Sequence, residues 1–97
     1  MISSTIKLEL STMPDLPGVY QFFDDSNKII YIGKAKNLKK RVASYFQKNL
    51  NSQKTKNLVK NIFEIKHVAV SSESDALLLE NSLIKKYQPK YNILLRD

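Results

Sequence analysis

The 97-residue sequence contains no cysteine and a single histidine, His67. The lack of cysteine excludes disulfide bonds, a catalytic thiolate and a cysteine zinc site, and one histidine cannot form a histidine metal cluster. Glycine and proline are also scarce, with two and three copies, which favours a compact chain rich in regular secondary structure. No apolar run approaches a membrane span, and the N-terminus lacks the basic and then apolar layout of a signal peptide. We therefore expect a cytoplasmic protein without membrane contact.

Acidic residues are the minority among the charged ones, with 9 Asp and Glu against 16 Lys and Arg and a formal net charge of +7. A chain of this length is sufficient for one domain with one modest core. The positive excess favours a polyanionic partner, because each phosphate that the protein neutralises releases condensed counterions. A lysine-rich domain without such a partner fits the charge equally well, so charge alone leaves both interpretations open.

The pattern of turn formers, caps and apolar residues predicts an α+β fold. The turn formers at 24–28 separate two segments that we expect to pair as a β-hairpin. The expected strands are residues 18–23, 28–33 and 64–70, and the expected helices are 37–47, 53–63 and 73–87. The order ββααβα predicts a small three-stranded antiparallel sheet flanked by helices. Residues 1–15 show little periodicity and are expected to form a loosely held lead-in.

Glu80 lies on the apolar face of the expected last helix. The residues three and four positions away from it are all apolar: Ala76, Leu77, Leu83 and Ile84. A carboxylate in such surroundings is costly unless a cation or hydrogen-bond donors compensate it. An ion pair and a divalent metal ion both meet this requirement. One carboxylate together with waters and phosphate oxygens suits Mg²⁺, which keeps much of its hydration.

Arg41 and Tyr45 lie one turn apart on the expected first helix, so their side chains can reach the same point. The planar fork of Arg41 is suited to phosphate oxygens, although exposed arginines are common on amphipathic helices. Other basic side chains on the two expected helices are candidates for nonspecific contacts with a nucleic-acid backbone. These are Lys39, Lys40, Lys54, Lys56 and Lys60.

Tyr20 and Tyr31 fall on the two strands of the expected hairpin. A strand tyrosine most often serves as packing. For Tyr31 to act as a base, its phenol must lose a proton that is normally held to about pH 10. A nearby Lys34, Arg41 or metal ion would favour the phenolate.

The expected hairpin carries the triplets Gly18-Val19-Tyr20 and Tyr31-Ile32-Gly33, and Lys34, Arg41, Tyr45, Glu80 and Asn92 follow in order. This ordered set resembles the GIY-YIG nuclease family, in particular its UvrC branch. The matching stretches are residues 16–20, 31–35, 37–42, 76–81, 83–87 and 89–97. The first triplet has valine where the family name has isoleucine, a variation that the UvrC branch usually shows. The resemblance thus covers a domain at 16–97, which we expect to be part of a longer protein.

The resemblance implies a role for each of seven residues. Tyr31 would be the general base that activates the attacking water or relays its proton. Glu80 would be the sole protein ligand of one Mg²⁺ or Mn²⁺, and Arg41 would stabilise the charge on the scissile phosphate. The remaining four residues, Tyr20, Lys34, Tyr45 and Asn92, would orient water, substrate and neighbouring side chains. The family thus resembles one-metal phosphodiesterases.

The resemblance also implies a biological role. It points to a DNA endonuclease that makes the 3′-side incision at lesions in bacterial nucleotide excision repair. The partners would be DNA and UvrB, on a lesion complex loaded by UvrA, and UvrB would contact regions outside this chain. The domain itself would be a monomer. Two alternatives stay open: a stand-alone or shorter UvrC-like nuclease, and a catalytically inactive DNA-binding module of the same fold.

Overall fold

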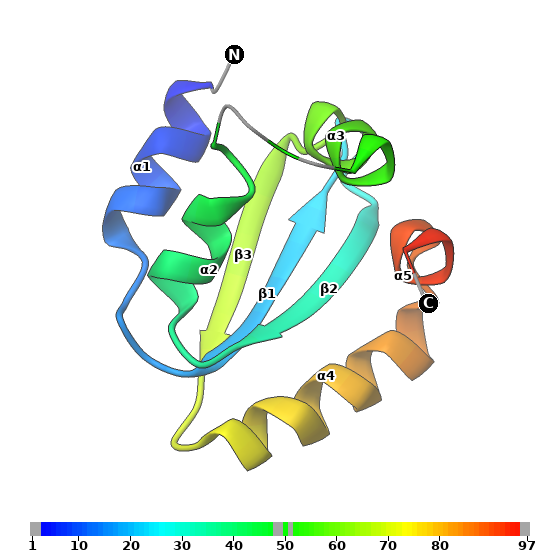
Figure 1. The fold of residues 1–97 in the computed structure, drawn as a ribbon. Helices are drawn as coiled ribbons and strands as arrows, with labels where there is room; N and C mark the ends of the chain where they lie inside the picture. The colour runs from blue at the N-terminus through cyan, green and yellow to red at the C-terminus, as the bar shows by residue number, and fades with distance from the viewer. Residues whose placement is uncertain (1–2, 48–49, 51, 96–97) are drawn as a thin grey trace.

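A computed structural model describes residues 3–47, 50 and 52–95 of the chain. Along the chain the elements are α1 (Ser4–Thr12), β1 (Gly18–Phe23), β2 (Ile29–Ala35), α2 (Leu38–Ser44), α3 (Gln53–Lys60), β3 (Glu64–Ala69), α4 (Glu73–Tyr87) and α5 (Lys90–Leu94). The strands form one antiparallel sheet in the order β2-β1-β3 (Figure 1). The expected three-stranded antiparallel sheet flanked by helices is confirmed.

The β1–β2 hairpin places two tyrosines on one face of the sheet. Its turn is closed by Asp24, whose Oδ1 accepts hydrogen bonds from the backbone amides of Ser26 and Lys28 at 2.9 and 3.0 Å. Tyr20 stands opposite Gly33 and Phe22 opposite Tyr31. Because alternate residues of a strand point to the same side, Tyr20 and Tyr31 project from the same face.

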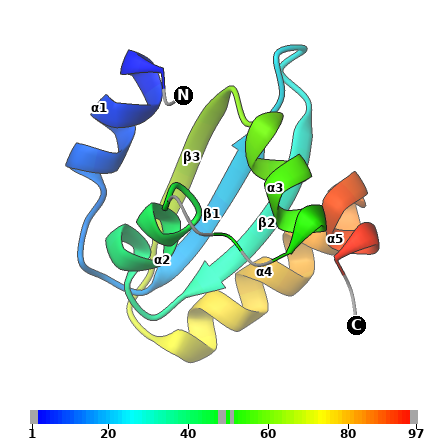
Figure 2. The same cartoon turned by 45° about the horizontal axis from the view of Figure 1, so that its top comes forward.

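The two faces of the sheet are covered by different helices (Figures 1 and 2). The face that carries Tyr20 packs with buried residues of α1, α2 and α3, including Leu38 and Leu58. The opposite face presents Val19 and Ile32 to Ala76 and its apolar neighbours on α4. The strand β2 therefore lies at the sheet edge between the two helical layers, and its edge is where the site forms.

The N-terminal segment differs from the expected loose lead-in, because residues 4–12 form α1. Ser3 caps this helix by accepting a hydrogen bond from the Ile6 amide at 3.2 Å, and Ile6 is buried. Glu9 then accepts a hydrogen bond from the backbone amide of Ile65 on β3 at 3.0 Å. Only one side chain within this helix is buried, so the sequence carried almost no apolar periodicity to reveal it.

Two helices end earlier than expected, and one further helix lies near the C-terminus. The helix α5 was not among the expected elements, and α2 and α3 end three residues before their expected ends. The α4 helix begins and ends as expected, with Ser72 capping the Asp75 amide at 3.2 Å. Among the described residues, no helix combines the length and the apolar character needed to cross a membrane.

Candidate active site

Three tyrosines from different segments converge on one face of the sheet beside β2. Tyr20 comes from β1, Tyr31 from β2 and Tyr45 from the residue that ends α2. The ring centroids of Tyr20 and Tyr31 lie 5.8 and 6.4 Å from that of Tyr45, and Phe22 fills the space between them. The tyrosines that the sequence singled out therefore form one aromatic cluster.

A chain of hydrogen bonds leads from this cluster to the arginine. The Tyr20 and Tyr45 hydroxyls are 2.7 Å apart, and Arg41 Nη2 donates to the Tyr45 hydroxyl at 3.0 Å. The guanidinium carbon also lies 4.8 Å from the Tyr45 ring centroid, a cation–π contact. Because Tyr20 is fully buried, it anchors Tyr45, which in turn holds the guanidinium group of Arg41 at the protein surface.

Gly33 provides the space that Tyr20 needs. A Cβ atom at position 33 would lie 2.3 Å from both Oη and Cζ of Tyr20, well inside van der Waals contact. The Gly33 backbone has an ordinary negative φ. The glycine is therefore required by the close approach of the tyrosine and not by a special turn.

The phenol groups of the cluster are neutral at physiological pH. Burial, followed by repulsion from Tyr31, raises the pKa of Tyr20 to about 12. Burial and the neighbouring Tyr45 hydroxyl also raise the pKa of Tyr31, and the opposing effect of Arg41 is weaker. The expectation that cations would favour a Tyr31 phenolate is thus met in direction by Arg41, but burial outweighs it. Tyr31 is a neutral phenol that can both donate and accept a hydrogen bond.

Glu80 stands on α4 on the other side of the β2 edge, and its side chain is half-buried. Burial raises the pKa of its carboxyl, while Lys34, through its ammonium and its backbone, opposes that rise. Lys34 follows Ile32 by two residues and so projects from the sheet face that α4 covers. Glu80 in turn contributes to the raised pKa of Tyr31. Glu80 therefore interacts electrostatically both with Lys34 and with Tyr31.

The donor set around Glu80 fits a hard divalent ion with a single protein ligand. No group of three or more His, Cys, Asp or Glu side chains gathers anywhere in the described part of the chain. One half-buried carboxylate leaves most coordination positions to waters and phosphate oxygens, which is the environment that Mg²⁺ tolerates well. Lys34 also keeps the ion-pair interpretation of Glu80 open. Of the four apolar neighbours expected around Glu80, Leu77 is largely exposed.

Asn92 binds the open edge of β2. Its Oδ1 accepts a hydrogen bond from the Ile32 amide and its Nδ2 donates to the Ile32 carbonyl, both at 2.8 Å. The side-chain amide thus replaces a missing partner strand. Its contacts hold α5 against the stretch of β2 between Tyr31 and Gly33, and Asn92 also lines the third hollow beside Tyr31.

Three hollows follow one another along this edge and share residues. The first is lined by Lys34, Lys40 and Arg41, among others. Arg41 also borders the second hollow, together with Tyr31 and Lys54, and Tyr31 borders the third. The other expected DNA-contacting lysines, Lys39, Lys56 and Lys60, are exposed but line none of these three hollows. Sequence reasoning missed Lys36 and Glu73, which also line the first.

The family model for the UvrC-like GIY-YIG domain matches residues 16–93. The UvrABC system protein C of Flavobacterium psychrophilum is 61% identical over 97 residues, and that of Christiangramia forsetii is 58% identical over 97 residues. The chain spans only 16% of the length of either relative.

A solved structure matches almost the whole chain. The crystal structure of the GIY-YIG N-terminal endonuclease domain of UvrC from Thermotoga maritima, bound to its catalytic magnesium, superposes with a TM-score of 0.82 and 38% sequence identity. The match covers 93% of this chain and 98% of that one. The chain therefore belongs to the UvrC-like GIY-YIG domain family.

Proposed function

We propose that this chain is a metal-dependent DNA endonuclease domain that makes the 3′-side incision at lesions in bacterial nucleotide excision repair. The observation that carries the proposal is the placement of Glu80 and Lys34 on one side of β2, with Tyr31 and the anchored Arg41 on the other. A related domain with 38% identity holds a catalytic magnesium ion, and the single carboxylate here fits the same kind of ion.

The residues divide the reaction between them. Glu80 would hold the metal ion, which supplies Lewis-acid activation of the phosphate and its leaving oxygen. Arg41, fixed through Tyr45, would bind a nonbridging phosphate oxygen and stabilise the charge that develops there. Tyr31 would accept a proton from the attacking water. Because its raised pKa keeps the phenol protonated, Tyr31 would act as a relay: it would give its own proton to a solvent molecule in one of the two hollows that it borders while it takes the proton of the attacking water.

The proposed partners are inferred from the names of the relatives and not from the structure of this chain. Relatives of this family are named as subunits of the UvrABC system, which supports action on DNA together with UvrB on a UvrA-loaded lesion complex. Since the chain spans 16% of those relatives, the contact with UvrB would lie in other regions of a longer protein. Repair of chromosomal DNA would place the protein in the cytoplasm, with the domain itself as a monomer.

Metal occupancy and cleavage together test the proposal. Crystals soaked with Mn²⁺ should give one anomalous peak bonded to Glu80 and facing Tyr31 and Arg41. Glu80→Gln should lose that peak and lower Mg²⁺-dependent DNA nicking by about a hundredfold or more, while it keeps DNA affinity. Glu64→Gln, on β3, is the matched control and should cut normally. If Glu80→Gln binds Mn²⁺ and nicks DNA like the parent chain, the metal assignment fails.

An inactive DNA-binding module would give a different result. Such a module needs the basic side chains but neither a half-buried Glu80 nor a Tyr31 at the strand edge. In that case the parent chain would bind DNA, show no anomalous peak at Glu80 and leave DNA uncut even in the assembled repair complex.

A further inference from the structure

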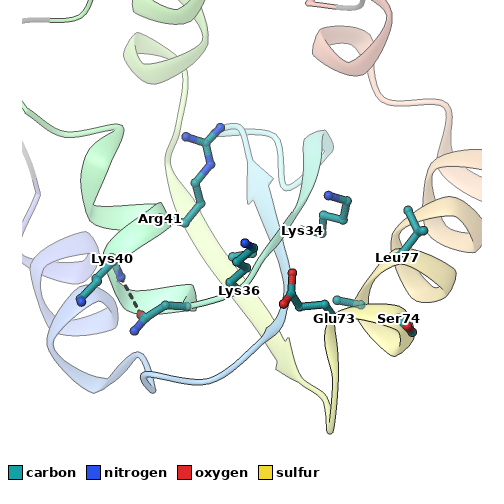
Figure 3. A pocket seen from close by; sticks show the side chains of 10 residues that line it. Lys34, Lys36, Lys40, Arg41, Glu73, Ser74 and Leu77 are labelled. Carbon is teal, nitrogen blue, oxygen red and sulfur yellow. Dashed lines mark hydrogen bonds between the residues drawn. The ribbon is translucent and has the colours of Figure 1, made fainter.

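The first hollow is a groove of about 550 Å³, and it contains residues to which the proposed reaction assigns no role. We call it the lysine groove. Its cationic side chains are Lys34, Lys36, Lys40 and Arg41, and Glu73 at the start of α4 is the carboxylate that lines it. In Figure 3 the labelled Lys36 and Glu73 side chains lie beside each other, and the Arg41 side chain extends away from them. Lys36 and Glu73 have no part in the chemistry at Glu80.

The lysine groove runs directly into the candidate active site. Lys34 and Arg41 belong to both, and Leu77 in the groove wall lies one turn before Glu80 on α4. A polynucleotide whose scissile phosphate is bound by Arg41 has to continue in both directions along the strand. Arg41 borders two hollows, the lysine groove and the second hollow. The lysine groove can therefore hold the strand on one side of the scissile phosphate.

The lining of the groove suits a sugar–phosphate unit. Ammonium and guanidinium groups bind phosphate oxygens through charge-assisted hydrogen bonds. The lining also includes the apolar residues Ala35, Ala76 and Leu77, of which the exposed Leu77 can contact a deoxyribose or a base. A mixed lining of this kind differs from a purely charged surface that attracts phosphate without seating the nucleotide.

The segment that carries Lys36 is firmly held. Asn37, the next residue, caps α2 by accepting a hydrogen bond from the Lys40 amide at 3.0 Å, drawn as a dashed line in Figure 3. The Asn37 side chain also donates to Asp15 at 3.1 Å, and the Leu38 amide donates to the Leu16 carbonyl at 2.9 Å. The backbone on either side of the two lysines is therefore fixed before a ligand arrives.

We propose that the lysine groove is the subsite for the nucleotide next to the scissile phosphate, with Lys36 and Lys40 bound to the phosphate on its far side. The inference rests on the proposed endonuclease function and names the strand path at the same site. Glu73 faces the same groove and weakens the binding of any anion there by repulsion. Lys36 and Glu73 thus have opposite effects on DNA affinity.

The salt dependence of DNA binding tests the subsite. A fluorescent DNA oligonucleotide is titrated with the 97-residue chain in metal-free buffer at several salt concentrations. Lys36→Ala should weaken binding and reduce the slope of log K against log salt by about one, as expected for one lost phosphate contact. Lys40→Ala should do the same. Lys7→Ala removes an exposed lysine of α1, outside the groove, and should leave the slope unchanged.

Glu73→Gln separates charge from structural damage, since it should strengthen DNA binding whereas damage to the fold would weaken it. The inference is overturned if Lys36→Ala and Lys40→Ala keep the parent affinity and slope, or if Glu73→Gln weakens binding. If instead the parent chain neither binds nor cuts DNA, the proposed endonuclease function fails, and the subsite with it.

Discussion

At the scale of single residues, the site is built from contacts between groups that are far apart in the sequence. Tyr20 reaches Tyr45 across 25 positions, and Arg41 is held by that pair. The identity of these residues could be predicted from their ordered resemblance to a nuclease family. Which of these side chains form hydrogen bonds with one another could not be predicted, because it depends on how closely α2 approaches the sheet.

Gly33→Ala should displace Tyr20 and so disrupt its hydrogen bond with Tyr45. The new methyl group would lie 2.3 Å from the Tyr20 hydroxyl, and Tyr20 is buried and cannot withdraw. We expect a loss of about 1–3 kcal/mol in the free energy of unfolding, typical of overpacking, together with lower nicking activity because Arg41 loses its support. Urea denaturation and a nicking assay measure the two effects.

A double-mutant cycle identifies the clash as the cause. In the Tyr20→Leu background the outer ring atoms are absent, so Gly33→Ala should destabilise the domain much less than it does in the parent chain. Equal losses in both backgrounds would show that Gly33 is needed for another reason.

At the scale of elements, the helices with strong local signals were predictable, and α1 and α5, whose local signals are weak, were not. The cap at Ser72 and the proline at position 89 define α4, and both are visible in the sequence. The short helix α5 has no side-chain cap. Each of the two helices buries one side chain, Tyr91 in α5 and Ile6 in α1, and is bound to the sheet by a polar one, Asn92 and Glu9.

Asn92→Ala should loosen the edge of β2 and detach α5. It removes both hydrogen bonds to Ile32, and we expect a loss of about 1–3 kcal/mol in the free energy of unfolding. The amide proton of Ile32 should exchange with solvent much faster. Asn92→Asp keeps an acceptor for that amide but has no donor for the carbonyl, so its effect should be intermediate.

Hydrogen exchange measured residue by residue shows whether Asn92 secures the β2 strand or instead takes part in the reaction directly. An Ile32 amide that stays as protected in Asn92→Ala as in the parent chain would mean that Asn92 does not secure the strand, and that any loss of activity has another origin.

At the scale of the whole molecule, the position of the grooves is the part of the site that sequence reasoning could not supply. The whole of α2, α3 and β3 lies between Lys36 and Glu73 in the chain, and the two residues line one groove because α2 and α4 both begin at the same end of the sheet (Figure 1). The excess of lysine was compatible with a polyanionic partner but did not by itself decide for one. It did not reveal which lysines line the strand path, because that depends on tertiary structure.

The stability of the whole domain should respond to the metal through Glu80. Burial raises the pKa of this carboxyl in the folded chain above its value in the unfolded chain. Protonation of Glu80 therefore stabilises the fold. The stabilisation is complete below the unfolded pKa of 4.5 and is lost as the pH rises through the higher folded value. At neutral pH the charged carboxylate therefore destabilises the metal-free fold, and a bound cation should offset this effect.

Thermal unfolding with and without Mg²⁺ tests this expectation in the parent chain and in Glu80→Gln. Magnesium at a hundred times its dissociation constant should stabilise the parent by about 2.7 kcal/mol and should leave Glu80→Gln unchanged. Without metal, Glu80→Gln should be at least as stable as the parent, because the amide is neutral. A metal-free Glu80→Gln that is clearly less stable would mean that the pairing of Glu80 with Lys34 outweighs the cost of burial. The carboxylate would then be retained for the fold and not for the metal.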